Sequence, residues 1–198
     1  MRSDTTIETY DRLADQYAQQ WDGMTPDSDE DDLVLLLDRE LPRKSSVLDA
    51  GSGSGRDLQR LVALGHSPQG LDASDALSTI ARQYAPVVTG DMRDMPFSEA
   101  SFDGILLSAS LLHLDANGAV EAMNECHRTL KPNGILVLSV KGGEGEIVDS
   151  QGRFFHFYDA TSLDELISSA GFSVLSGGSN VDSARNVEWL NRICRRIS

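Results

Sequence analysis

Short apolar runs alternate with amphipathic segments through most of the 198 residues. Runs with the length and composition of strands lie at residues 47–50, 68–72, 87–89, 101–108, 135–140, 172–175 and 187–193. The run at 135–140 is almost wholly apolar, as expected for a central parallel strand buried on both faces. Segments with helical spacing lie between these runs, so the pattern predicts an α/β protein.

Local signals place the ends of the predicted helices. Helical spacing predicts helices at residues 8–21, 33–41, 55–64, 75–84, 117–130 and 163–170. Pro42, Gly65 and Gly171 mark helix ends. Ser74 has the chemistry of an N-cap. Ser162 and the residue three places later, Glu165, have the spacing of a capping box.

The apolar run at residues 47–50 leads into a glycine-rich loop. Asp49 stands near the end of the run, and Gly51, Gly53 and Gly55 follow at alternate positions. Glycine lets the backbone turn sharply and approach a ligand without a Cβ in the way. The helix that begins near Gly55 points its unpaired N–H groups into the same loop. In α/β proteins this arrangement holds a nucleotide at the carboxyl end of the first strand.

The spacing of the glycines separates this loop from two common nucleotide motifs. A dinucleotide fingerprint, Gly-x-Gly-x-x-Gly, requires glycine where this chain has Arg56. No Gly-Lys-Ser/Thr follows the glycines, which excludes a P-loop. A nucleotide-dependent reductase is therefore disfavoured.

The sequence Leu-Asp-Ala-Gly-Ser-Gly-Ser-Gly resembles the glycine-rich motif of class I S-adenosylmethionine (SAM)-dependent methyltransferases. In that family the acid at the strand end and the glycine loop hold the methionine part of SAM. The resemblance therefore assigns cofactor binding to Asp49, Gly51, Ser52, Gly53 and Gly55.

The same resemblance implies the architecture of the whole chain. It implies a Rossmann-like sandwich, in which helices cover both faces of a seven-stranded, mostly parallel sheet with an antiparallel last strand. A single domain is expected over residues 1–198. Within it, residues 42–198 form the SAM-binding core and residues 1–41 form an N-terminal helical lid or cap.

Further motifs match the family in the same order along the chain. Asp72, with Ala73 beside it, lies 17 residues beyond Gly55, near the position of an acid that binds the ribose hydroxyls. The segment at 90–97 resembles the family's "GD…LPF" motif, in which Asp91 would bond the adenine amino group and Met92 would lie against the ring. Ser108 ends a strand that resembles the family's "FD.I" strand, whose end opens on the reacting methyl group.

The helix predicted at residues 8–21 carries a tyrosine-rich stripe. Its members recur at steps of three and four and are Tyr10, Leu13, Ala14, Tyr17, Ala18 and Trp21. One interpretation is that the stripe only packs the helix on the domain. The other, implied by the resemblance, is a lid, in which Tyr17 contacts the cofactor and Tyr10 and Trp21 contact the acceptor. The acidic segment at 22–32 is expected to be a solvated loop whose last acids favour the next helix.

The residues after the fourth strand, 108–113, are where the resemblance places the methyl acceptor. His113 is the candidate catalytic residue, because imidazole can take a proton near neutral pH. The alternative is a structural or cofactor-pocket histidine. The aromatic segment at 152–158 supplies two further candidates for acceptor contacts, Arg153 and His156, although its alternation also fits simple core packing.

Composition narrows the class of partner. The net charge of −14 disfavours direct nucleic-acid binding, which depends on Lys and Arg contacts to phosphate. No apolar run approaches the ~18 residues of a membrane span, and the start of the chain lacks the layout of a signal peptide. The two cysteines, Cys126 and Cys194, lie far apart, which favours a reduced, cytoplasmic protein. His, Cys and acidic residues do not show metal-site spacing, so no metal is expected.

The sequence thus predicts a SAM-dependent methyltransferase that modifies an O or N atom of a small molecule and releases S-adenosylhomocysteine. No Asn/Asp-Pro-Pro-Tyr/Phe sequence is present, which argues against amino groups of bases or glutamine as acceptors. One alternative is a tRNA or protein methyltransferase working with a partner, since residues 152–172 resemble the tail of tRNA wobble-uridine methyltransferases. The other is a non-catalytic SAM-binding module. The oligomeric state cannot be read from the sequence.

Overall fold

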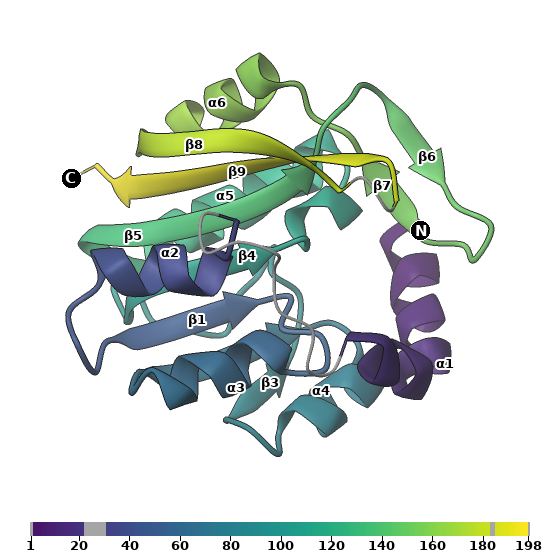
Figure 1. The fold of residues 1–198 in the computed structure, drawn as a ribbon, viewed down its shortest axis with the longest axis horizontal. Helices are drawn as coiled ribbons and strands as arrows, with labels where there is room; N and C mark the ends of the chain where they lie inside the picture. The colour runs from purple at the N-terminus through teal and green to yellow at the C-terminus, as the bar shows by residue number, and fades with distance from the viewer. Residues whose placement is uncertain (1, 22–30, 183–184, 198) are drawn as a thin grey trace.

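The computed structural model describes residues 2–21, 31–182 and 185–197. Its main sheet has seven strands in the order β3-β2-β1-β4-β5-β9-β8 (Figure 1). The strands are β1 (Ser46–Ala50), β2 (Ser67–Asp72), β3 (Val87–Thr89), β4 (Phe102–Ser108), β5 (Leu130–Lys141), β8 (Phe172–Asp182) and β9 (Val187–Arg196). Strand β9 runs antiparallel to both of its neighbours, and the pairs among β1 to β5 are parallel. The predicted mixed sheet with a reversed last strand is confirmed.

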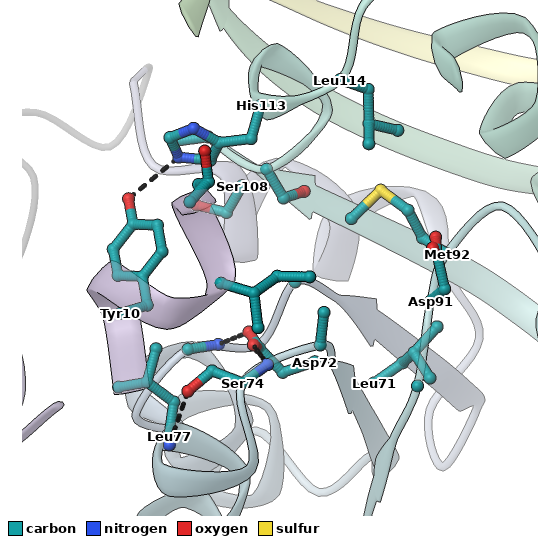
Figure 2. A pocket seen from close by; sticks show the side chains of 18 of the residues that line it. Tyr10, Leu71, Asp72, Ser74, Leu77, Asp91, Met92, Ser108, His113 and Leu114 are labelled. Atoms are coloured by element: carbon teal, nitrogen blue, oxygen red, sulfur yellow. Dashed lines mark hydrogen bonds between the residues drawn. The ribbon is translucent and has the colours of Figure 1, made fainter. Parts of the chain in front are cut away.

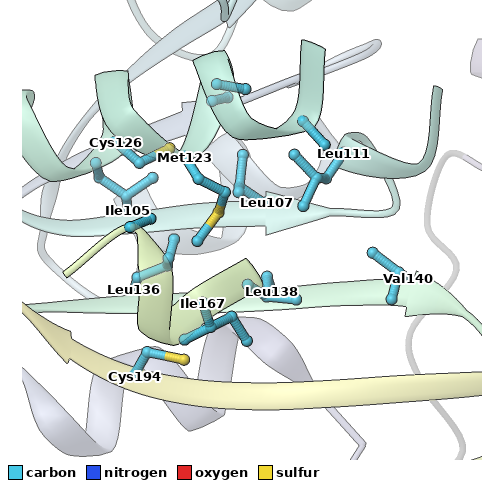
Figure 3. Packing of buried hydrophobic residues seen from close by; sticks show 14 of the residues in the cluster. Ile105, Leu107, Leu111, Met123, Cys126, Leu136, Leu138, Val140, Ile167 and Cys194 are labelled. Atoms are coloured by element: carbon cyan, nitrogen blue, oxygen red, sulfur yellow. The ribbon is translucent and has the colours of Figure 1, made fainter. Parts of the chain in front are cut away.

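Helices cover both faces of this sheet, as predicted. They are α1 (Arg2–Trp21), α2 (Leu33–Glu40), α3 (Arg56–Ala63), α4 (Asp75–Ala81), α5 (Ala116–Thr129) and α6 (Ala160–Ser169), with a short 3₁₀ turn η1 (Leu111–His113). Helices α2 and α3 pack on one face through Leu37 and Leu61. Helices α5 and α6 pack on the other through Met123 and Ile167 (Figure 3).

The larger core cluster lies between α5, α6 and the central strands. Leu107 of β4 and Leu138 of β5 are fully buried there against Met123 (Figure 3). Burial of each such side chain contributes about 1.5–3 kcal/mol relative to exposure. Because β4 and β5 are held between two apolar layers, their carboxyl ends form a rigid edge on which the following loops sit.

Helix α1 crosses this edge and is held by hydrogen bonds to two different parts of the fold. The Asp11 carboxylate accepts hydrogen bonds from the Ser74 hydroxyl at 2.6 Å and the Ala76 N–H at 3.1 Å, at the start of α4. On the other side, Thr6 Oγ1 accepts the Phe154 N–H at 2.9 Å. The stripe residues of α1 from Tyr10 to Trp21 are buried or half-buried, which agrees with the packing interpretation.

Two local predictions were wrong. Asp159 caps α6 by accepting from the N–H groups of Thr161 and Ser162, so Ser162 lies in the first turn and does not form the predicted capping box with Glu165. Asp159 reaches those N–H groups because it lies just outside the helix, where an N-cap must be. The predicted helix at 75–84 ends earlier, at Ala81, since residues 82–84 continue as a turn.

The structure also extends several elements. Helix α1 begins at Arg2, and β8 and β9 form a long hairpin. A second, two-stranded sheet joins β6 (Glu146–Val148) to β7 (Phe154–His156). Most of the acidic segment at 22–32 lies outside the described residues. Its last residue, Asp32, caps α2 through the N–H groups of Val34 and Leu35, as predicted for the acids before that helix.

Candidate active site

A cavity lies at the carboxyl ends of the parallel strands, between the glycine loop, α1 and η1 (Figure 2). We call it the glycine-loop cavity. Its lining residues are Thr6, Ile7, Tyr10, Tyr17, Gly51, Gly53, Leu71, Asp72, Ala73, Ser74, Leu77, Gly90, Asp91, Met92, Arg93, Ser108, Ala109, Ser110, His113 and Leu114. Residues from helix α1 and from four segments that follow strands therefore meet in one place, as expected at the carboxyl edge of a doubly wound sheet.

The glycine loop packs closely on the residues after β4. Gly51 has a φ of +84°, and a Cβ there would lie 2.2 Å from the Cβ of Ser110. The Ser110 hydroxyl donates to the Ala50 carbonyl at 2.7 Å, which fixes the two loops against each other. A side chain at position 51 would therefore push the loop away from β4 and into the cavity.

Asp72 lies at the end of β2 with its carboxylate in the cavity wall. One oxygen accepts the Gly53 N–H at 2.7 Å and the other accepts the Ser74 N–H at 2.9 Å (Figure 2). Burial raises the pKa of this carboxyl, and the two N–H groups oppose that rise. Each carboxylate oxygen has a further lone pair, so Asp72 can still accept hydrogen bonds from a diol.

Asp91 and Met92 form the opposite wall. Arg93 donates to Asp91 through its backbone N–H at 2.8 Å and through Nε at 2.9 Å. Burial tends to raise the pKa of Asp91, but the hydrogen bonds from Arg93 outweigh it and the pKa is lowered. Asp91 therefore stays ionised and can accept from an exocyclic amino group.

Asp49 lies beneath the glycine loop and is 1% exposed. Neither of its carboxylate oxygens, nor the nearby Ser52 hydroxyl, has a hydrogen-bond partner among the described residues. Burial, together with the charge of Asp57, raises the pKa of Asp49 well above its ordinary value. A buried carboxylate without a partner is costly, which makes Asp49 a candidate for contact with a ligand.

Tyr10 and His113 form the end of the cavity nearest η1. The Tyr10 hydroxyl and His113 Nε2 are 2.9 Å apart (Figure 2). On the other side of the ring, His113 Nδ1 lies 2.7 Å from the Phe154 carbonyl. A carbonyl only accepts, so Nδ1 carries the proton and the Tyr10 hydroxyl donates to Nε2. Burial, together with the positive charges of Arg153 and Lys141, lowers the pKa of His113 to about 4, although the hydrogen bond to the Phe154 carbonyl opposes this fall. The imidazole is therefore neutral at pH 7.

Comparison with known proteins identifies the family. The profile of the methyltransferase domain matches residues 48–138. A protein of Encephalitozoon cuniculi that carries the name methyltransferase is 31% identical over 172 residues, which cover 75% of this chain and 80% of that protein. The chain belongs to the methyltransferase family.

Two further relatives show how far the likeness extends. The malonyl-[acyl-carrier protein] O-methyltransferase 1 of Coxiella burnetii is 26% identical over 159 residues, covering 76% of this methyltransferase and 55% of that enzyme, so this chain spans about half its length. The 1,6-didemethyltoxoflavin-N1-methyltransferase of Burkholderia thailandensis, solved with 1,6-didemethyltoxoflavin and S-adenosylhomocysteine, superposes with a TM-score of 0.84 at 20% identity. The superposition covers 98% of this chain and 88% of that one. This methyltransferase has the class I fold and uses SAM as its cofactor.

The residues present fit that cofactor. The unpartnered carboxylate of Asp49 below the glycine loop suits a bound ammonium group nearby, and Gly53 leaves the loop backbone open to the cavity. In the glycine-loop cavity Asp72 would hold a ribose diol, and Asp91 with Met92 would hold an adenine. When bound, SAM supplies a methyl group on a sulfonium, already activated for displacement. The protein's part is to align the acceptor and to exclude water.

The structure separates the residues predicted from sequence into two groups. The cavity is lined by Tyr10, Tyr17, Gly51, Gly53, Asp72, Ala73, Asp91, Met92, Ser108 and His113. Six others do not line it, namely Trp21, Asp49, Ser52, Gly55, Arg153 and His156. Of these, Trp21 lies under the guanidinium of Arg185, 4.6 Å away, and His156 is paired with Glu146 at 3.3 Å. Arg153 remains close, 5.9 Å from the ring of Tyr10.

Sequence reasoning missed several lining residues. Thr6 and Ile7 belong to the first turns of α1, before the predicted start of that helix. Arg93 follows Asp91 by two positions, and this short spacing was the available signal for their pairing. Ser110 lies in the segment 108–113 predicted to adjoin the acceptor, but its contact with Gly51 appears only in the structure. No group of three or more His, Cys, Asp or Glu side chains in the described part of the chain could hold a metal ion.

Proposed function

We propose that this methyltransferase transfers the methyl group of SAM to an O or N atom of a small-molecule acceptor bound beside Tyr10 and His113. The observation that carries the proposal is the Tyr10–His113 hydrogen bond at the end of the cavity that adjoins Ser108. Tyr10 donates its proton to Nε2, so its oxygen keeps lone pairs that can accept an O–H or N–H of the acceptor.

Tyr10 is then the group that touches the acceptor, and His113 acts through it. With the pKa of His113 at about 4, full proton transfer to the imidazole at pH 7 is unfavourable. The pair instead orients the acceptor's lone pair toward the methyl group, and the methylated product, which is more acidic than the acceptor, then loses its proton to water. Alignment is the main source of catalysis in such a displacement.

The position of helix α1 supports the proposal of a small acceptor, because this helix covers the cavity with Thr6, Ile7, Tyr10 and Tyr17. We propose that α1 is the lid. Helix α2, also part of the expected cap at 1–41, packs its buried Leu33, Val34 and Leu37 on the sheet. Residues 42–198 form the SAM-binding core of the same domain.

The net charge of −14 argues against direct binding of nucleic acid without the help of a partner protein. Cys126 and Cys194 are both buried and free, which supports a reducing, cytoplasmic location. No helix in the described part of the chain is long and apolar enough to cross a membrane.

The test is incubation of the protein with methyl-deuterated SAM and a fractionated metabolite extract, followed by mass spectrometry. The expected result is one or a few small molecules that gain a deuterated methyl group. Labelling confined to RNA or protein fractions would contradict the proposal and favour a macromolecular acceptor. If no small molecule, RNA or protein is labelled although the protein binds SAM normally, the result would favour a non-catalytic module.

A further inference from the structure

The ring of Phe155 lies behind His113 and is approached by two cations. The imidazole of His113 and the ring of Phe155 have centroids 4.8 Å apart. Lys141 Nζ lies 3.8 Å from the Phe155 centroid, and the guanidinium carbon of Arg153 lies 5.4 Å from it. Two positive charges therefore converge on one ring in a protein whose net charge is −14.

Lys141 is half-buried and has no acid partner among the described residues. The chain has three lysines, of which Lys131 pairs with Asp103 at 2.7 Å and Lys44 is exposed. Lys141 is half-buried, yet no described carboxylate lies within 4.0 Å of its Nζ. A charge in this position is normally paired, because partial burial removes part of its hydration.

The charges around Lys141 leave a positive surplus. Asp149 is the acid whose field reaches it, and that carboxylate is already bound to Arg153 at 2.7 Å. Burial and the nearby Arg153 lower the pKa of Lys141. Glu188 near Gly142 and Glu146 beside His156 are not among the charges that shift the pKa of Lys141.

The register of β4 and β5 places Lys141 next to the end of the cavity formed by Tyr10 and His113, where the acceptor is proposed to bind; we call it the acceptor end. Ser108 of β4 pairs with Ser139 of β5, and the Ala109 N–H donates to the Ser139 hydroxyl at 3.1 Å. Lys141 is two residues further along β5 and so extends from the same face of the strand. Ser108, Ala109 and His113 line the cavity.

We propose that the acceptor carries an anionic group, a carboxylate or a phosphate, which binds Lys141 with help from Arg153. This inference rests on the proposed function, since it assumes that the acceptor's nucleophilic atom lies beside Tyr10. The anionic group of the acceptor would give the Lys141 ammonium the acid partner that it lacks. The Arg153 guanidinium can add charge-assisted hydrogen bonds to the same anion. The negative charge of the whole protein repels free anions, so a local cation pair is what an acidic acceptor requires.

The three lysines allow a direct test by NMR. Reductive ¹³C-methylation keeps the charge of each lysine, and Lys→Arg variants assign the three side-chain signals. The S-adenosylhomocysteine complex of the full chain is titrated with inorganic phosphate, malonate and 4-hydroxybenzoate. Malonamide and 4-hydroxybenzamide are the neutral counterparts. The proposal predicts a saturable shift of the Lys141 signal with one class of anion and none with the amides, and the responding class distinguishes carboxylate from phosphate.

Lys44 is the internal control, because it is exposed and lies in the turn before β1. A Lys141 signal that moves no more than that of Lys44, or equally with acids and amides, would overturn the proposal. In a second arm, Lys141→Met should weaken binding of the responding anion by about 10- to 100-fold. Lys44→Met should leave it unchanged.

Calorimetry with S-adenosylhomocysteine distinguishes a failure of this inference from a failure of the proposed function on which it rests. Lys141→Met should bind this product as the parent does, because Lys141 does not line the cavity. If neither protein binds it, the proposed function fails. If the parent and Lys141→Met both bind S-adenosylhomocysteine and the Lys141 signal does not respond to anions, only the inference about the acceptor fails.

Discussion

The hydroxyl of Tyr10 donates to Nε2 of His113 at 2.9 Å, although 103 residues separate the two in sequence. The bond joins the covering helix α1 to the turn that follows β4. Because His113 is held in turn by the Phe154 carbonyl, helix α1, the turn after β4 and the β6–β7 hairpin are connected through one imidazole. The position of α1 and the geometry of the acceptor end of the cavity are therefore coupled.

Replacing Tyr10 with phenylalanine should lower kcat by about tenfold, the value of one orienting hydrogen bond. The affinity for S-adenosylhomocysteine should change little, because the ring and its packing remain. Tyr84→Phe is the matched control, since that tyrosine packs against the opposite side of the loop at Gly55. Steady-state kinetics that give Tyr10→Phe the parent's kcat would remove Tyr10 from acceptor binding.

His113 should make the stability of the folded protein depend on pH. Its pKa is about 4 when folded and ~6.5 when unfolded, so between these values the unfolded chain binds more protons. The contribution of neutral His113 to the unfolding free energy is fully present above pH 6.5 and is lost as the pH falls toward 4. The difference in unfolding free energy between the parent and His113→Asn should therefore shrink by up to about 3 kcal/mol over that range.

Urea denaturation at several pH values measures this difference. His127→Asn on α5 gives the general effect of exchanging a histidine for asparagine. A gap between the parent and His113→Asn that stays constant from pH 7 to pH 4 is the outcome that contradicts the depressed pKa. In kinetics, a neutral His113 predicts no inflection of kcat near pH 6.5 from this residue, whereas a general base with an ordinary pKa would produce one.

Asp49→Asn should stabilise the protein and weaken its cofactor binding at the same time. The folded-state pKa of Asp49 is raised, so its ionisation costs stability as the pH rises above ~4. Removing this unpaired charge should raise the unfolding free energy at neutral pH by about 1–4 kcal/mol, and the gain should diminish toward pH 4. Calorimetry should show at least tenfold weaker binding of S-adenosylhomocysteine. A variant that is less stable than the parent at pH 7 would refute this account of Asp49.

Asp72→Ala should weaken SAM binding by about 1–3 kcal/mol, the usual cost of removing a charged hydrogen-bond partner. The variant also releases the N–H groups of Gly53 and Ser74. Asp72→Asn, which keeps the shape of the side chain, helps to separate loop geometry from ligand contact. Asp75→Ala is the control, because Asp75 lies next to the site in α4 and bonds Thr89. Equal affinities for Asp72→Ala and the parent in calorimetry would end the ribose assignment.

A truncated protein beginning at Asp31 should fold and lose turnover. It keeps Asp32, which caps α2 and pairs with Arg60, and it lacks α1. Loss of α1 opens the cavity and removes Tyr10 and Tyr17 from its wall. Circular dichroism should show a cooperative thermal transition, and the activity on the acceptor identified above should fall sharply. Full activity of the truncated protein would rule out the lid.

The sequence was sufficient to predict the sheet, and most of the predicted cofactor residues line one cavity, because both depend on local patterns. Apolar runs, glycine spacing and the acids that follow strands all lie within short segments, and each had one consistent structural meaning. The capping box was different, since Ser162 satisfied the pattern while Asp159, three residues earlier, also had capping chemistry. Only the structure showed which of the two lies outside the helix.

The acceptor side could not be read in this way because it depends on contacts between distant segments. A lysine that ends a strand, such as Lys141, has the pattern of a solvated residue, and its approach to Phe155 appears only when β5 and the β6–β7 hairpin are placed together. The low pKa of His113 likewise arises from burial beneath α1 and beside Phe154, which no local spacing encodes. Sequence alone gave this histidine the pKa of a free imidazole.

A crystal structure of the protein with S-adenosylhomocysteine tests the central claim most directly. The account predicts ribose hydroxyls on the Asp72 carboxylate, adenine beside Asp91 and Met92, and the thioether sulfur facing the end of the cavity formed by Tyr10 and His113. A sulfur that points away from Tyr10 and His113, or an adenosine bound outside the glycine-loop cavity, would contradict it.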